Sequence, residues 1–77
     1  MKPGDFVRGK HPYHNTSMVL HPDDDGEYGT IGYVRAGEFA VVVDVLRCDD
    51  AYCDYMKVIN THGIIGWIPE NQLVVVE

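Results

Sequence analysis

The sequence predicts an all-β fold, a small antiparallel barrel of five to six strands with one short helical turn before the last strand. Apolar residues make up 45% of the chain, and they cluster as Val, Ile, Tyr and Phe, which pack well on a pleated sheet. Eight glycines and four prolines supply turns for many short strands. Residues 38–47 alternate with a period of two, the pattern of a strand. We expect one domain, residues 1–77, because this length allows only one core.

The N-terminal half of this domain, residues 1–36, is expected to be irregular and rich in loops. Turn residues and short apolar runs follow one another without a long period. The pattern predicts a strand at Phe6–Arg8, a loop at Gly9–Ser17 and a brief apolar run at Met18–Leu20. An acidic loop at His21–Gly29 and a second strand at Thr30–Val34 follow.

Residues 37–77 are expected to form the core hairpins, and the longest strand is Glu38–Arg47. Strict alternation assigns its side chains to two faces: Phe39, Val41, Val43 and Val45 on one, and Ala40, Val42, Asp44 and Leu46 on the other. Both faces are partly apolar, which is typical of a central strand in a barrel.

The remaining segments complete two hairpins and a closing strand. Cys48–Cys53 is expected to be a hairpin loop and Asp54–Asn60 the strand after it. Thr61–Gly63 is then a tight turn that leads into the strand Ile64–Ile68. Last come a helical turn at Pro69–Gln72 and a final strand at Leu73–Val76. We expect Met56, Val58 and Ile68 in the core and Trp67 on the outside, because neighbouring strand residues point to opposite faces.

The formal net charge is −6, from twelve acidic and six basic residues. Nucleic acid and anionic membranes are therefore poor partners, because binding a phosphate backbone requires a basic surface. A basic protein or peptide is the partner that this charge favours. The sequence shows no secretory signal after Met1 and no apolar run of membrane-spanning length. We therefore expect a cytoplasmic protein, in which Cys48 and Cys53 stay reduced.

The stretch from Asp54 to Leu73 resembles the second half of SH3 domains. In that family the motif G-x-x-G is followed by an aromatic residue, an aliphatic residue, the motif P-x-N-Y and a further aliphatic residue. The segment Gly63–Leu73 (GIIGWIPENQL) differs from this pattern at one position. Upstream, Gly37–Val43 (GEFAVVV) is similar to the pattern that opens the corresponding strand in bacterial SH3-type barrels. The resemblance covers about residues 37–76. It implies a small SH3-like barrel.

The resemblance also implies a recognition site. SH3 domains bind proline-rich peptides on an aromatic shelf, and the matching positions are Tyr55, Trp67, Pro69 and Asn71, with Gln72 where the family has a second tyrosine. The N-terminal A-L-Y-D-Y word of the family is absent, so fewer shelf aromatics are present. Acidic residues of the family that contact a ligand arginine correspond loosely to Asp23, Asp24, Asp25 and Glu27.

Metal and catalytic sites are less well supported by the sequence. Zinc could be bound by residues of the types His and Cys, which here are His11, His14, Cys48 and Cys53. However, the C-x4-C spacing of the two cysteines is at the edge of the usual range for paired zinc ligands. The acidic run lacks the spacing of a calcium loop. No nucleophile elbow, H-E-x-x-H word or phosphate-binding loop occurs, and pairing either cysteine with His62 rests on residue types alone. We expect no metal, no cofactor and no enzymatic activity.

The predicted function is therefore non-catalytic binding of a protein or peptide, with a basic partner favoured. Trp and Tyr dominate binding hot spots, and Tyr55, Trp67 and Pro69 would form the recognition face. Two alternatives stay open: a small accessory subunit of a larger enzyme or electron-transfer complex, and a module that binds a cell-wall ligand.

Overall fold

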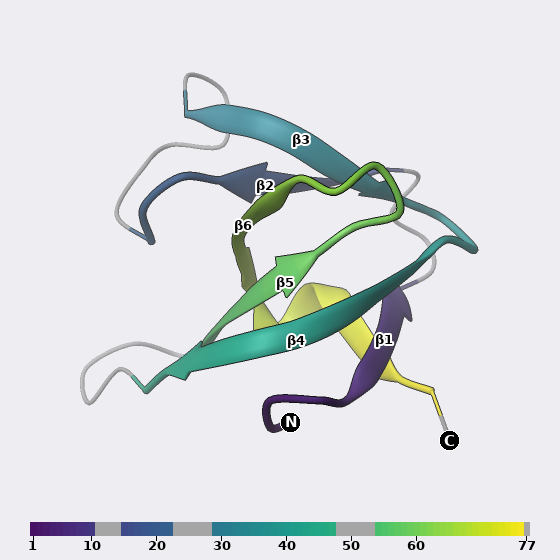
Figure 1. Cartoon of the computed structure of the whole chain (residues 1–77), viewed down its shortest axis with the longest axis vertical. Coiled ribbons are helices and arrows are strands. Elements are labelled where there is room, and N and C mark those ends of the chain that lie inside the picture. Colours follow the sequence, from purple (N-terminus) through teal and green to yellow (C-terminus); the bar gives the residue numbers. More distant parts are fainter. Residues whose placement is uncertain (11–14, 23–28, 48–53, 77) are drawn as a thin grey trace.

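The computed structural model describes residues 1–10, 15–22, 29–47 and 54–76 (Figure 1). Within them the chain forms seven strands and one short 3₁₀ helix. These elements are β1 (Phe6–Gly9), β2 (Asn15–Val19), β3 (Thr30–Arg35), β4 (Phe39–Leu46), β5 (Tyr55–Ile59), β6 (Ile65–Pro69), η1 (Glu70–Gln72) and β7 (Leu73–Val75). No helix in these ranges is long and apolar enough to cross a membrane.

The strands form one sheet in the order β3-β2-β6-β5-β4-β1-β7, and every ladder is antiparallel. The dimensions of the molecule show that the sheet is strongly curled. A flat sheet with its side chains would be only about 10 Å thick, but the shortest dimension of the molecule is 23 Å. A single parallel bridge between Gly9 and Ala36 brings the end of β3 beside β1. No ladder joins the edge strands β3 and β7 among the described residues, so the sheet is not a closed barrel.

The all-β prediction is confirmed, and so is the helical turn before the last strand, which is η1. The predicted strand number of five to six is wrong, since seven strands are described. The expectation of an irregular N-terminal half is also wrong where β2 and β3 form a five-pair hairpin. β2 begins at Asn15, inside the predicted loop Gly9–Ser17, because its polar residues pair with β3 across the sheet.

The core lies on the concave side of the curled sheet and receives side chains from β1 to β7. The buried cluster consists of Val7, Met18, Val34, Ala40, Val42, Met56, Val58, Ile68 and Leu73. The predictions for Met56, Val58 and Ile68 are therefore confirmed. We call this side of the sheet the core face and the opposite side the outer face.

β4 departs from strict alternation at a β-bulge. Val42 pairs with Val58, but the next pair is Asp44 with Lys57, so Val43 is an extra residue on β4. A bulge of this kind moves the following side chains to the other face. As a result Val45 packs against the core while Leu46 is exposed. The sequence-based assignment of faces is correct up to Val42 and wrong for Asp44, Val45 and Leu46.

The turn between β5 and β6 is held by Asn60. Its side-chain Oδ1 accepts hydrogen bonds from the backbone N–H groups of His62 and Ile64, each 2.9 Å long. Its Nδ2 donates to the carbonyl oxygen of Tyr33 on β3 at 3.0 Å. Gly63 has φ of +79°, a conformation that favours glycine. The predicted tight turn is thus confirmed, and it fixes the register of the β5–β6 hairpin.

Candidate functional site

The β5–β6 hairpin brings three of the predicted site residues together on the outer face. In its register Tyr55 lies opposite Pro69, and Trp67 lies opposite Lys57. The residues between them, Met56, Val58 and Ile68, point into the core. Tyr55, Trp67 and Pro69 therefore share one surface, which we call the aromatic face.

Trp67 is half-buried rather than fully exposed. The Lys57 Nζ lies 5.8 Å from the centre of its ring, within the range of a cation–π interaction. On its other flank Trp67 pairs with Val19 of β2. β2 can approach this closely because Gly66 has no side chain: a Cβ there would lie 3.0 Å from the Met18 Cβ and 3.1 Å from the Val19 carbonyl oxygen. Strand contacts and Lys57 thus restrict the indole, and part of it remains accessible.

Backbone contacts hold η1 beside the aromatic face. The Glu70 N–H donates to the Asp54 carbonyl at 2.9 Å, which joins the start of η1 to the residue before Tyr55. Asn71 is exposed on η1, and Gln72 is half-buried with its carbonyl accepting from the Lys10 N–H at 2.9 Å. Asn71 and Gln72 therefore lie at the edge of the aromatic face and not among Tyr55, Trp67 and Pro69.

Charged groups of both signs surround the aromatic face. Arg47 and Asp54 form a salt bridge of 2.6 Å, and the Arg47 side chain is 72% exposed. Asp44 lies opposite Lys57 in register and accepts a 2.8 Å hydrogen bond from the Val45 N–H. Glu70 follows Pro69 directly. Among the described residues near this face, a basic ligand could reach the carboxylates of Asp44 and Glu70.

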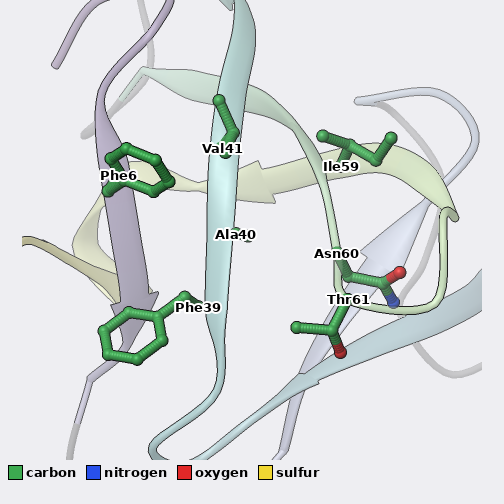
Figure 2. Close-up of a pocket in the computed structure, with 7 residues that line it drawn as sticks. All are labelled: Phe6, Phe39, Ala40, Val41, Ile59, Asn60 and Thr61. Carbon is green, nitrogen blue, oxygen red and sulfur yellow. The ribbon is translucent and has the colours of Figure 1, made fainter.

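The structure also shows a surface that the sequence analysis did not assign to a site. A shallow cavity of about 250 Å³ lies on the outer face, at the other end of β4 and β5 (Figure 2). Its lining residues are Phe6, Phe39, Ala40, Val41, Ile59, Asn60 and Thr61. Alternation had placed Phe39 and Val41 on one face, but only the pairing of β1 with β4 brings Phe6 beside them.

Most of the remaining candidate residues fall in segments that the structure does not describe. His11, His14, Cys48 and Cys53, and the acidic residues Asp23, Asp24, Asp25 and Glu27, lie outside the described residues. Among the residues that are described, no group of three or more His, Cys, Asp or Glu side chains could hold a metal ion. His62 is exposed in the β5–β6 turn.

Comparison with known proteins finds no matching family model, no matching curated protein and no matching solved structure. The SH3 resemblance therefore remains one of short sequence words in residues 37–76. The function has to be argued from the geometry of the chain itself.

Proposed function

We propose that the protein is a non-catalytic module that binds a protein or peptide through the aromatic face. The observation that carries the proposal is the register of the β5–β6 hairpin, which sets Tyr55 opposite Pro69 with Trp67 two residues away on the same surface. Rigid aromatic rings on paired strands offer large contact area at a small cost in conformational entropy. Such side chains are enriched among the residues that dominate binding energy.

We further propose that the fold is a partly open SH3-like barrel. The order of elements after residue 37 supports this proposal: a long strand, two strands joined by a tight turn, a 3₁₀ helix and a short last strand. The words shared with SH3 domains fall on the tight turn, β6 and η1. The bridge from Gly9 to Ala36 supports near-closure of the sheet. In this interpretation the aromatic face corresponds to the peptide-binding shelf.

A basic partner fits the charges of the chain. The net charge is −6, and the Asp44 and Glu70 carboxylates lie near the aromatic face. Lys57 already occupies one side of the Trp67 ring, so a ligand cation would be directed to these carboxylates and apolar groups to the rings. Electrostatic attraction of this kind mainly increases the association rate and weakens as salt is added.

Peptide selection followed by alanine substitution tests the proposal. Peptides are selected from a random library on the immobilised full chain, and their affinities are measured for the wild type and for Trp67→Ala, Tyr55→Ala and Glu70→Lys. We expect Trp67→Ala or Tyr55→Ala to weaken binding by about 2 kcal/mol, or roughly 30-fold. Glu70→Lys should weaken the binding of basic peptides more at low salt than at high salt.

Tyr33→Ala is the matched control, because Tyr33 is an aromatic residue of β3 that is 48% exposed and lies outside the aromatic face. Its affinity should stay within about twofold of the wild type. Circular dichroism establishes that each variant is folded. If folded Trp67→Ala and Tyr55→Ala bind the selected peptides as tightly as the wild type, the aromatic face is not the binding site.

A further inference from the structure

A second apolar surface crosses the outer face at the end of β4 opposite Leu46. In register, Phe6 lies beside Val41, Val41 beside Ile59, and Ile59 beside Ile65, which makes a row across β1, β4, β5 and β6. Phe39 lies two residues from Val41 on the same surface. Figure 2 shows the two phenyl rings on the β1 side of β4 and Ile59 with Thr61 on the other side. We call Phe6, Phe39, Val41, Ile59 and Ile65 the Phe39 face.

The Phe39 face is unusually open for large apolar side chains. The exposed fractions are 59% for Phe6, 50% for Phe39 and 46% for Ile65. No described residue covers the cavity beside Phe6 and Phe39. A contiguous apolar surface of this kind commonly marks an interaction site in a water-soluble domain.

Opposite charges flank Phe39 on its two sides. Arg8 lies opposite Phe39 in the β1–β4 register and is exposed. On the β5 side Thr61 Oγ1 donates a 3.1 Å hydrogen bond to Glu38 Oε2, which places the carboxylate there. Neither Arg8 nor Glu38 has an ion-pair partner among the described residues. The surface thus runs from a cation, across a phenyl ring, to a carboxylate.

This arrangement is self-complementary. A two-fold axis that lies in the contact plane, runs perpendicular to the line from Arg8 to Glu38 and passes near Phe39 superposes each flank of one copy on the opposite flank of the other. Arg8 of each copy then faces Glu38 of the other, and the two Phe39 rings meet near the axis. We propose that the occupant of the Phe39 face is a second copy of this chain, in a symmetric dimer with two reciprocal Arg8–Glu38 ion pairs.

The area of the surface sets the strength of the dimer. A Phe side chain buries roughly 150–250 Å², so the half-exposed side chains of the Phe39 face supply on the order of 300–400 Å² per copy. Stable interfaces bury about 800 Å² per partner, and even those range down to micromolar affinity. The dimer is therefore weak, with a dissociation constant above about 1 μM, and exchanges with the monomer.

The proposal is independent of the aromatic face. Tyr55 and Ile59 are four residues apart on β5, about 13 Å at 3.3 Å per residue. A dimer through the Phe39 face leaves two aromatic faces free, one on each copy. Such a pair of sites would increase the apparent affinity for a partner that carries two binding segments.

Charge exchange combined with sedimentation equilibrium tests this dimer. Measurements run from about 10 μM to 1 mM of the full chain, spanning the expected dissociation constant, at an ionic strength of about 0.15 M that screens net repulsion. The wild-type mass should rise from the 8.7 kDa monomer towards twice that value. Arg8→Glu or Glu38→Arg alone sets like charges against each other at both contacts. Each should weaken the dimer at least tenfold.

Two samples should restore association. In the double variant Arg8→Glu/Glu38→Arg each contact is again an ion pair, with the net charge of the wild type. An equimolar mixture of the two single variants should form mixed dimers for the same reason. The matched control is Arg47→Glu, which changes the net charge as Arg8→Glu does but lies beyond the far end of β4. It should dimerise like the wild type.

Four results would overturn the proposal. One is a wild-type mass that stays at 8.7 kDa up to 1 mM. Another is a dimer that neither single variant weakens, which would lie on a different surface. The third is failure of both the double variant and the mixture to regain association while circular dichroism shows that they are folded. A protein that stays monomeric but binds apolar peptides at Phe39 would also contradict the proposal.

Discussion

Asn60 shows how much one side chain contributes to this fold. It is 7% exposed and satisfies three backbone groups, two in its own turn and one on β3. These contacts tie the β5–β6 hairpin to the edge strand β3, which is separated from β6 by β2 in the sheet order. The side chain therefore stabilises both the local turn and the curl of the sheet.

We expect Asn60→Ala to lower the free energy of unfolding by about 2–4 kcal/mol, because it leaves three partly buried backbone groups without partners. Thr61→Ala is the control, since the neighbouring Thr61 is exposed and makes only an exposed hydrogen bond. Its effect should stay within about 0.5 kcal/mol. Urea denaturation of both variants measures the difference. Equal losses for the two variants would show that the Asn60 contacts do not hold the fold.

At the scale of elements, the contact between β2 and β6 depends on the absence of a side chain at Gly66. An added Cβ would lie 3.0 Å from the Met18 Cβ and 3.1 Å from the Val19 carbonyl, which is backbone and cannot rotate away. The Val19–Trp67 pair is the register contact between these strands. The hairpin β2–β3 is therefore attached to the rest of the sheet at a narrow point.

Gly66→Ala should cost roughly 1–3 kcal/mol, the usual penalty for overpacking. The loss should be local, so hydrogen exchange should accelerate at Met18 and Val19 before it does at Val58. Gly32→Ala is the comparison variant, because its Cβ would meet side-chain atoms of Ile64, including the terminal Cδ1. It should be the milder change. Uniform acceleration across the sheet in Gly66→Ala would contradict a local role for the contact.

Elements with a strong local signal were predictable from the sequence. The alternation in residues 38–47 predicted β4, and the Thr61–Gly63 turn predicted the β5–β6 hairpin. The grouping of Tyr55, Trp67 and Pro69 was implied by the SH3 resemblance, and the hairpin register sets the three on one surface. β2 was missed because Asn15–Ser17 is polar and without period, and only pairing with β3 makes it a strand. The bulge at Val43 was missed because it is a property of the β4–β5 pairing.

At the scale of the whole molecule, the outer face carries two distinct surfaces. The aromatic face lies where β5 begins and β6 ends, and the Phe39 face lies at the opposite end of β5. Lys57 lies between them on β5, opposite Trp67 of the aromatic face. The SH3 resemblance implied the aromatic face, and one local hairpin builds it. The Phe39 face could not be predicted, because it requires β1 and β4 to become neighbours, and Phe6 and Phe39 are 33 residues apart in the sequence.

Trp67 is the only tryptophan of the chain, so its fluorescence reports directly on the aromatic face. A selected peptide is titrated into the full chain while the emission and its quenching by acrylamide are recorded, and calorimetry gives the bound fraction independently. If the ligand covers the accessible part of the indole, the emission should shift to shorter wavelength and quenching should decrease in proportion to the bound fraction. A peptide that saturates the protein by calorimetry and leaves both signals unchanged would show that the ligand does not bind at the aromatic face.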